Sequence, residues 1–427
     1  AWHQIQYRPP EGEEGETASP MAQVSEAVVE SAGGAVELAI GLIGVMTLFL
    51  GLMKVAEAGG MLTVLARLIR PLMTRLFPDV PPDHPAMGSM ILNMSANAMG
   101  LGNAATPFGI RAMQELDRLN PHKGTATNSM ALFLAINTSS VTLLPTGVIA
   151  LRASAGSAEP AAILPSTLFA TACATVAAVI AAKTYQRFSP SPSPDPETTR
   201  DDEPADTDSS QPDDPDGSLA DAAAASATGY PLWVSYAFLG GLLALIPLSI
   251  AFGRVIAPWI IPGLIVFFLA YGAVRRVRVY EVFVEGAREG FQVAVRIMPY
   301  LVGILVAVGM FRASGAMEAL VQWVGDYTEH LGMPAEALPM ALLRPLSGSG
   351  AYGIMASIIN DPAVGPDSYT GLLVTTLQGS TETTFYVLAV YFGAVQIRRV
   401  RHTLAASLTA DVVGVMAAVA VCLYLFG

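Results

Sequence analysis

Cysteine is scarce in this chain. Cys173 and Cys422 are the only two, and both lie inside apolar runs, where a thiol behaves as a small hydrophobic side chain. Two isolated cysteines support neither a disulfide framework nor a thiolate metal site. The sequence therefore gives no sign of a covalently stabilised domain.

Histidine is nearly as rare, and no catalytic or metal-binding pattern accompanies it. The five histidines show no HExxH motif or other ligand spacing, and no nucleophile–base pair stands out among the polar residues. We therefore expect no resident metal, no other cofactor and no enzymatic activity. A coupling ion such as H⁺ or Na⁺ stays open.

Charged residues are also few, at 14% of the chain, whereas 52% of the residues are hydrophobic and the mean hydropathy is +0.49. These values are typical of polytopic membrane proteins. The net charge of −12 lies mostly in residues 1–33 and 189–228, and the remainder is mildly basic without a nucleic-acid patch. We therefore expect a lipid bilayer as partner and no nucleic acid, and a homo-oligomer stays open.

Eight segments are apolar enough to cross a bilayer, which takes about 20 mostly apolar residues. They are approximately 34–53, 129–151, 161–182, 231–252, 256–274, 291–311, 371–394 and 403–426. Residues 1–33 form a polar N-terminal segment, which lacks the basic start and apolar core of a signal peptide. Residues 61–77 place arginines among apolar residues, which favours a helix at the membrane interface.

Two further apolar stretches, 86–119 and 337–359, are interrupted by Gly, Asn, Ser and Pro. They predict re-entrant or discontinuous helices, which are tolerated at membrane depth only where protein or water satisfies the freed backbone groups. Residues 188–229 are acidic and rich in Pro and Ser, which predicts a disordered linker. This linker separates a half at 34–187 from a half at 230–427, which has one additional leading span.

The two halves repeat each other. Residues 30–62 and 285–320 share glycines and apolar runs in the same order. Lys and Arg concentrate in short cytoplasmic loops, and residues 54–128 hold seven of them whereas 312–370 hold two. Five spans between the copies also invert the second one. The predicted fold class is an all-α polytopic membrane protein with two inverted-topology repeats and broken helices, although a duplication kept only for packing remains the alternative.

Polar side chains inside the apolar segments are the candidate substrate-binding residues, because an unpaired buried polar group costs about 2–7 kcal/mol and lipid offers no partner. We expect most of them to line one cavity near the membrane midplane. Close helix packing and hydroxyl bonds to the helix's own carbonyls are structural alternatives. The candidates are Asn97, Asn103, Asn137, Ser139, Ser140, Arg344, Ser347, Gln378, Ser380, Thr381 and Glu382.

Two charged residues in these segments have alternative roles. Arg344 follows an apolar segment and precedes a proline, so it either binds an anionic group or pairs with a carboxylate such as Glu382. Glu382 is itself a candidate ion, proton or ligand site. Asp411 in the last span is a weaker candidate, because it stands alone.

Several long motifs resemble known families. Residues 24–187 are similar to the spore maturation protein A family through FPDVPPDHPAMG, GLGNAATPFGIRAM and FLAINTSSVTLLPT. Residues 256–426 are similar to the spore maturation protein B family through VYEVFVEGAREG, PMALLRPLSGSGAYG, QGSTETTFYVLAVYFGAV and ADVVG. The chain thus resembles a fusion of the two. Protein A of this family normally begins with a membrane span, and none is expected here before residue 34.

Both families carry the nucleoside recognition, or Gate, domain, which is shared with concentrative nucleoside transporters and ferrous-iron transporters. This resemblance implies a multi-pass protein with broken helices that contact substrate. Gln378, Thr381 and Glu382 are similar in character to a Gln-Thr-Glu segment of the nucleoside transporters, but Gly379 and Ser380 intervene.

The leading interpretation is a transporter or permease for a small polar solute, with nucleosides or related heterocycles as the class that the resemblance suggests. The alternative is a non-transporting membrane protein that supports envelope (spore-like) maturation or a partner complex. We expect the bacterial plasma (inner) membrane, with multiple spans and the acidic linker in the cytoplasm. The sequence does not identify the substrate, the coupling ion or the direction of transport.

Overall fold

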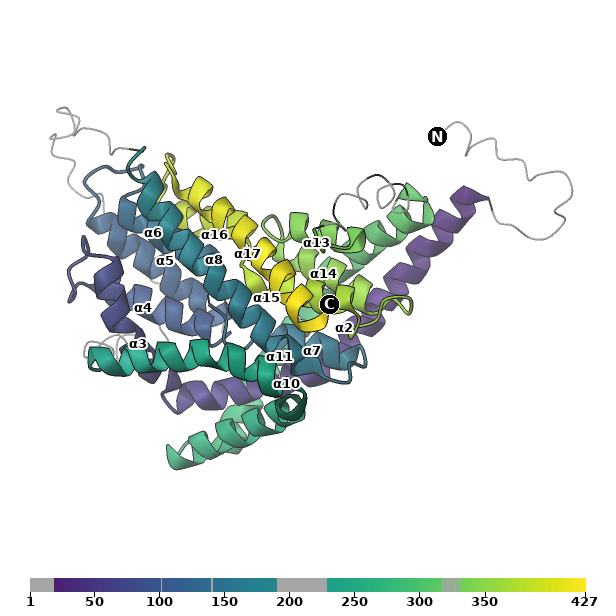
Figure 1. Ribbon diagram of the computed structural model, residues 1–427, viewed down its shortest axis with the longest axis horizontal. Helices are drawn as coiled ribbons and strands as arrows, with labels where there is room; N and C mark the ends of the chain where they lie inside the picture. Colours follow the sequence, from purple (N-terminus) through teal and green to yellow (C-terminus); the bar gives the residue numbers. More distant parts are fainter. Residues whose placement is uncertain are drawn as a thin grey trace, which may run out of the picture.

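The chain folds into helices. The computed structural model describes residues 19–100, 102–139, 141–189, 229–316 and 331–427, together with residues 319, 323 and 328 (Figure 1). Within these ranges no β-strand occurs, so the all-α prediction is confirmed. Residues 1–18 and most of the acidic segment, 190–228, lie outside the described residues.

The first half contains one long helix followed by shorter ones. Its elements are α2 (Pro20–Ala58), α3 (Met61–Leu76), α4 (Pro85–Ala98), α5 (Gly102–Arg118), α6 (Asn128–Thr138), α7 (Thr146–Ser154), η1 (Pro160–Ile163) and α8 (Leu164–Tyr185). Helix α2 begins 14 residues before the predicted span at 34–53. The hydroxyl of Ser19 accepts a hydrogen bond from Ala22 N, and Pro20 occupies the first turn. Both features favour the start of a helix, although this segment is too polar to be recognised as a membrane span by its hydropathy.

The second half has an additional leading helix. Its elements are α10 (Leu232–Val274), α11 (Val279–Ala313), η3 (Ala335–Ala337), α13 (Leu338–Leu343), α14 (Gly348–Ile359), α15 (Tyr369–Ser380), α16 (Thr384–Gly393) and α17 (Thr403–Phe426). The spans predicted separately at 231–252 and 256–274 form the single helix α10. The residues between them are not helix-terminating, so the sequence offered no physical reason for a boundary.

Two predicted spans are each split into two helices. Residues 129–151 form α6 and α7, and residues 371–394 form α15 and α16. Hydroxyl side chains compete for backbone bonds at both breaks, and Pro145 precedes the start of α7. In the described part of the chain, three helices are therefore long and apolar enough to cross a membrane, and they lie at Met21–Ala58, Pro160–Tyr185 and Thr403–Phe426. The breaks expected in 86–119 and 337–359 occur at residues 99–101 and 344–347.

Helices α2 and α11 pack against each other along most of their length. A Cβ at Gly286 would lie 2.7 Å from the Leu50 carbonyl oxygen, and a Cβ at Gly290 would lie 2.7 Å from the Met46 carbonyl oxygen. Further along, Gly309 lies against Ser31. Because residue numbers rise in α11 as they fall in α2, the two helices are antiparallel. These are the helices that carry the repeated glycine pattern.

Helices α8 and α17 form a second antiparallel pair (Figure 1). A Cβ at Gly414 of α17 would lie 3.3 Å from the Cβ of Ala174 in α8. Nearer the start of α8, the Ser166 hydroxyl lies 2.8 Å from the Thr376 hydroxyl, which the Cys422 thiol also contacts. In addition, α6 of the first half contacts α17 of the second half, and α15 of the second half contacts α8 of the first. The broken helix of each half therefore packs against the last helix of the other half.

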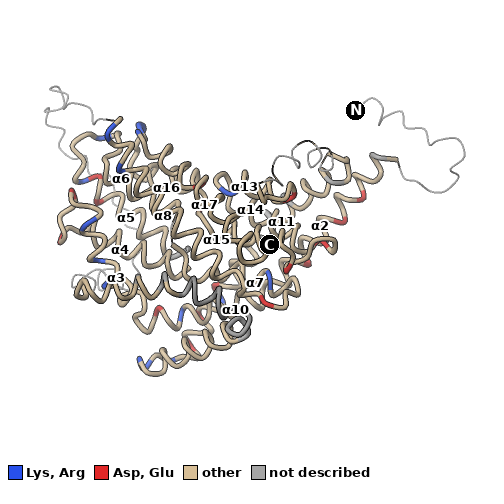
Figure 2. The backbone as a smooth tube through the Cα atoms, viewed as in Figure 1, with Lys and Arg blue, Asp and Glu red and all other residues tan. Residues whose placement is uncertain are grey.

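The buried apolar side chains form two clusters, and each cluster combines both halves. The first contains residues of α3 to α6 together with α16 and the start of α17. The second contains residues of α13 to α15 and the end of α17 together with α2 and α7. The halves therefore cannot be separated without exposing apolar surface. The helices at the centre of the molecule carry few charged residues (Figure 2).

Candidate functional site

The breaks of the two split helices meet. Helix α6 ends at Thr138, and the break of the other half includes Glu382. The backbone N–H of Glu382 donates a hydrogen bond of 2.7 Å to the Thr138 carbonyl oxygen. Carbonyls at the end of a helix have no partner within the helix, so here one half supplies the partner for the other. This contact fixes the two breaks beside each other.

Each break is also bonded to the turn of the preceding helix pair in its own half. Leu143 N donates to the Ala98 carbonyl oxygen at 2.9 Å, and Phe385 N donates to the Pro345 carbonyl oxygen at 3.1 Å. Gly100 adopts φ +77°, and a Cβ there would lie 2.6 Å from the Leu144 carbonyl oxygen. This position therefore requires glycine, both for the left-handed backbone and for the close approach.

A cavity of about 280 Å³ lies where the breaks meet. It is lined from both halves by amide, hydroxyl and charged groups, and four of the predicted site residues are among them. The lining residues are Asn97, Gly100, Thr142, Leu144, Pro145, Thr146, Gly147, Val148, Arg344, Gly348, Tyr352, Gln378, Gly379, Glu382 and Thr383.

The carboxamides of the cavity differ in how they are satisfied. Asn97 Nδ2 donates to Asn137 Oδ1 at 2.9 Å, and Asn137 Nδ2 donates to the Phe133 carbonyl oxygen at 3.0 Å. The two asparagines therefore hold each other between α4 and α6. Gln378 Oε1 is buried and has no hydrogen-bond partner among the described residues. A buried amide oxygen left unpaired is costly, so Gln378 Oε1 is an unused acceptor in the cavity wall.

Arg344 connects the end of α15 to the break. It is 5% exposed, and its Nε donates to the Gln378 carbonyl oxygen at 3.1 Å. Its other nitrogens donate to the Thr381 carbonyl oxygen and, at 3.1 Å, to Thr383 Oγ1. The guanidinium thus lies at the C-terminus of α15, where positive charge is favourable, and of the two roles considered for Arg344 the pairing with Glu382 is the one for which the structure shows a contact.

Glu382 pairs with this arginine but remains open to the cavity. Arg344 Nη2 lies 3.6 Å from Glu382 Oε2, and the Glu382 side chain is 48% exposed. The carboxylate is thus held by a buried cation on one side and stays accessible on the other. Such an arrangement can accept hydrogen bonds from a solute.

The remaining predicted residues serve the backbone or are not described. The hydroxyls of Ser139 and Ser380 donate to carbonyls of their own helices, at 2.9 Å in both cases, and Ser347 accepts from Gly350 N at the start of α14. Thr381 offers its carbonyl oxygen to Arg344. None of these four side chains lines the cavity. Ser140 and the side chain of Asn103 lie outside the described residues.

Sequence reasoning missed most of the lining residues, among them Tyr352 and Thr383. The Tyr352 hydroxyl donates to the Gly147 carbonyl oxygen at 3.2 Å and so joins α14 to the start of α7. Thr383 faces Arg344. Tyr352 lies in an apolar, glycine-rich run, where a tyrosine does not stand out in the sequence as a site residue. Its role is visible only in the structure, where its hydroxyl contacts the first turn of α7.

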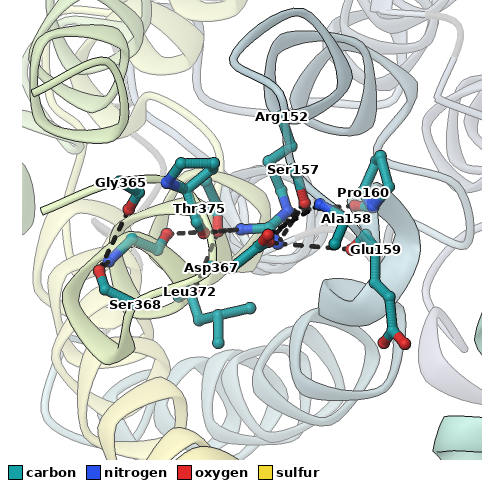
Figure 3. Close-up of polar contacts among 12 residues, drawn as sticks. Arg152, Ser157, Ala158, Glu159, Pro160, Gly365, Asp367, Ser368, Leu372 and Thr375 are labelled. Atoms are coloured by element: carbon teal, nitrogen blue, oxygen red, sulfur yellow. Dashed lines mark hydrogen bonds and ion pairs between the residues drawn. The ribbon is translucent and has the colours of Figure 1, made fainter. Parts of the chain in front are cut away.

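A buried arginine joins the halves on one side of the cavity. Arg152 at the end of α7 is 0% exposed, and its Nη2 lies 2.9 Å from Asp367 Oδ1 (Figure 3). The same guanidinium donates to the carbonyl oxygens of Pro160 and Pro366, at 3.2 and 2.6 Å. Asp367 also accepts from Ser157 Oγ and from Ala158 N. We call this set of contacts, between residues 152–160 and 366–375, the Arg152 latch.

An equivalent contact joins the halves at the other end. The backbone N–H groups of Arg398 and Arg399, after α16, donate to the Gly124 carbonyl oxygen at 2.9 and 3.0 Å. In return, Ala126 N donates to the Arg399 carbonyl oxygen at 3.0 Å. We call this the 124–126 latch. In both latches the segment after a broken helix contacts the loop before the broken helix of the other half.

Comparison with known proteins agrees with this two-part organisation. The nucleoside recognition (Gate) family model matches residues 39–155 and 294–398, one segment in each half and together more than half of the chain. The chain is 46% identical over 160 residues to spore maturation protein A of Bacillus subtilis (strain 168), which is 38% of this chain and 82% of that protein. It is also 46% identical over 167 residues to spore maturation protein B of the same organism, 39% of this chain and 93% of that protein.

A more distant relative is also a membrane protein. The inner membrane protein YjiG of Escherichia coli (strain K12) is 32% identical over 103 residues, which cover 23% of this chain and 65% of that protein. No solved structure matches the chain. The expected likeness to both spore maturation families is thereby confirmed.

Proposed function

Because the chain belongs to the nucleoside recognition (Gate) family, we propose that it is a multi-pass membrane permease rather than an enzyme. Its substrate would be a small polar solute, with nucleosides or related heterocycles as the class. The observation that carries the proposal is the cavity between the halves, where two broken helices meet and leave Glu382 accessible to a solute, with Gln378 in the cavity wall. Broken helices at the interface of two repeats are the usual construction of a transporter binding site.

The helix pairs support an alternating-access mechanism between inverted repeats. Helices α2 and α11 begin the family match in their respective halves, at residues 39 and 294, and they pack antiparallel. Helices α8 and α17 close the two halves and are also antiparallel. A two-fold axis in the membrane plane would relate both pairs in this way. The two latches then lie at opposite faces of the membrane, where each would open in turn.

The chemistry of the cavity favours a small solute with hydrogen-bonding edges. Its volume of about 280 Å³ is at the lower end of the range for ligand pockets, roughly 300–1,000 Å³. Gln378 and Glu382 offer acceptors, and Thr142, Thr146 and Tyr352 offer hydroxyls. Groups of this kind recognise the donor and acceptor edges of a heterocycle or the hydroxyls of a sugar.

A second candidate function is a non-transporting role in envelope maturation. The printed names of the two relatives with 46% identity refer to spore maturation and not to transport. This alternative gives no reason for a buried, unpaired Gln378 beside an accessible Glu382. We place both functions in the inner membrane, with the acidic segment at 188–229 in the cytoplasm.

Solute uptake by proteoliposomes tests the proposal. A panel of radiolabelled nucleosides, nucleobases and small dicarboxylates should show saturable uptake of at least one nucleoside or nucleobase. Glu382→Gln should abolish this uptake while leaving thermal unfolding in detergent nearly unchanged, because Arg344 keeps its carbonyl partners. Glu336→Gln is the matched control, since Glu336 is exposed and outside the cavity. If wild-type vesicles take up none of the panel above empty vesicles, the maturation role replaces the permease.

A further inference from the structure

Asp411 is a buried carboxyl group that the solute cavity does not use. It lies on α17, is 4% exposed and does not line the cavity. Thr384 Oγ1, at the first residue of α16, donates a hydrogen bond of 2.7 Å to Asp411 Oδ2. Asp411 Oδ1 has no hydrogen-bond partner among the described residues. One oxygen of this carboxyl group is therefore bonded to the first residue of α16, and the other is unsatisfied.

A second unsatisfied group lies one turn away. The Ser407 hydroxyl is fully buried, and within the described part of the chain it also lacks a hydrogen-bond partner. Residues 407, 411 and 414 share one face of α17 at spacings of four and three. At Gly414 this face approaches the break, because a Cβ there would lie 2.9 Å from Thr381 Cγ2. Asp411 thus lies on the side of the break that faces α17, whereas Glu382 lies on the side that faces the solute cavity.

Few charged groups surround Asp411. Four helices, α6, α8, α15 and α16, pack against α17, and Lys183 near the end of α8 is the one formally charged residue that they contain. Their other titratable residues are Cys173, Tyr185, Tyr369, Tyr386 and Tyr391. From outside these helices, the field of Arg344 reaches Asp411, and Arg344 is also the partner of Glu382. The same arginine therefore links Asp411 to the solute cavity.

We propose that Asp411, held by Thr384, is a proton-binding site that couples proton movement to the rearrangement of the α15–α16 break. The inference rests on the proposed transport function and names its coupling ion. A carboxylate without a direct cationic partner is costly in apolar surroundings, and a bound proton removes that cost. When Oδ1 of Asp411 takes up a proton, the carboxyl group becomes neutral while Oδ2 keeps the bond from Thr384. The proton comes from water and returns to it when the break opens the site.

A metal cation fits this site less well than a proton. Hard cations such as Ca²⁺ and Mg²⁺ take six or more oxygen ligands, whereas the side-chain oxygens assembled here are those of one carboxyl group and two hydroxyls. In the described ranges no group of three or more His, Cys, Asp or Glu side chains could hold a metal ion. A proton needs one basic oxygen, which the unpaired Oδ1 of Asp411 provides.

The pH dependence of thermal unfolding tests the site without requiring a known solute. In the purified protein in detergent, the contribution of Asp411 to stability should fall as the pH rises and its carboxyl group loses its proton. Asp411→Asn imitates the protonated form in shape, so the variant should lack this part of the pH dependence. Thr384→Val removes a donor to the ionised carboxylate and should move the loss of stability to higher pH. If both variants follow the wild-type profile, or if Thr384→Val does so where Asp411→Asn does not fold, the proposal is overturned.

A transport arm separates this inference from the proposed function. Proteoliposomes that contain a pH indicator should show proton movement together with solute uptake for the wild type, and uptake without proton movement for Asp411→Asn. Solute uptake that neither moves protons nor changes with pH would keep the permease and remove the proton site. A changed unfolding profile in Asp411→Asn with no uptake by the wild type would keep the proton site and remove the permease.

Discussion

Arg152 shows how much one buried side chain contributes to joining the halves. Its guanidinium donates to three backbone carbonyls, two hydroxyls and Asp367, and it belongs to the first half whereas Asp367 and Thr375 belong to the second. Charge-assisted bonds of this kind are roughly twice as strong as neutral ones. Burial of an arginine is costly unless all of its donors are occupied, which explains why the loops at 157–160 and 365–367 are folded around it.

Replacement of Arg152 should therefore destabilise the whole protein. Arg152→Met keeps most of the side-chain volume but leaves carbonyls and Asp367 without their partner, so we expect a loss of about 2–4 kcal/mol. Thermal unfolding in detergent measures it. Arg398→Met is the matched control in the other latch, because the Arg398 side chain is exposed and its contact uses the backbone N–H. Equal effects of the two substitutions would contradict the role given to the Arg152 guanidinium.

His402, which precedes α17, should make stability depend on pH. Burial and the nearby Arg401 lower the pKa of His402 to about 4 from its ordinary value of 6.5. Between these values the unfolded chain binds a proton that the folded protein does not. The stabilisation is therefore complete above pH 6.5 and is lost as the pH falls towards 4.

Unfolding temperatures measured from pH 7 down to pH 4 test this prediction. His402→Leu should flatten the acidic limb of the profile, because both ring nitrogens lack partners among the described residues and no hydrogen bond is lost. His122→Leu, at a partly exposed histidine, leaves His402 in place and should keep the limb. A limb that persists in His402→Leu would assign the acid sensitivity to other groups.

At the scale of helices, the glycines between α2 and α11 set the distance of approach. A Cβ added at Gly290 would lie 2.7 Å from the Met46 carbonyl oxygen and 2.8 Å from Thr47 Cα, both of them backbone atoms. Backbone cannot move aside as the end of a flexible side chain can. Gly290→Ala should therefore separate the helices and cost about 1–3 kcal/mol, as overpacking does.

The control for this substitution lies in the same helix. At Gly303 an added Cβ would meet nothing within 4 Å, so Gly303→Ala should leave stability unchanged or raise it by the better helix propensity of alanine, about 1 kcal/mol at most. Unfolding temperatures of the two variants provide the comparison. If Gly290→Ala is as stable as Gly303→Ala, close packing of α2 on α11 is not what the glycine serves.

Several elements were predictable from the sequence, and the reason for each failure is physical. Interrupted apolar runs marked the breaks near residues 100 and 345, because Gly and Pro weaken a helix wherever they occur. The break at 139–145 was hidden inside a run long enough to be a span. Its position depends on Glu382 of the other half, which supplies a hydrogen bond to Thr138. A sequence window cannot contain a partner that lies about 240 residues away.

The candidate site was also predicted only in part. Asn97, Arg344, Gln378 and Glu382 do line one cavity, because isolated strongly polar groups in apolar segments have few other places to go. Ser139 and Ser380 do not, since a hydroxyl can bond to a carbonyl of its own helix, which a residue type alone does not reveal. Asp411 was weighed below Glu382 because it stands alone in the sequence, yet its hydroxyl partner Thr384 is supplied by another helix.

At the scale of the whole molecule, many Lys and Arg residues gather at one end, together with acidic partners such as Glu57, Glu285 and Asp117. Lys54, Lys123, Lys183 and residues 275–278 and 398–401 lie at the end where α2 and α8 finish and α11 and α17 begin. Many acidic residues lie toward the other end, including those near the start of α2 and beside α7 (Figure 2). Because Lys and Arg mark the cytoplasmic side, the basic end, with the 124–126 latch, should face the cytoplasm, and the Arg152 latch should face outward.

Cysteine labelling tests this orientation and the inversion together. Gly156 follows α7 and Gly393 ends α16, and at both an added Cβ would meet nothing within 4 Å. A cysteine at position 156 has to adopt the left-handed backbone of Gly156, with φ +78°, at a cost of about 1–2 kcal/mol. In a background with Cys173→Ala and Cys422→Ala, Gly156→Cys should react with a membrane-impermeant maleimide on intact cells. Gly393→Cys should react only after the membrane is permeabilised.

The two positions are informative because α7 and α16 occupy the same place in their halves. Repeats of equal orientation would put both cysteines on one side, whereas inverted repeats put them on opposite sides. The cysteine-free protein gives the background, and Lys183→Cys at the end of α8 provides a second cytoplasmic position on the first half itself. Labelling of Gly156→Cys and Gly393→Cys from the same side would end the inverted-repeat proposal, and with it the alternating opening of the two latches.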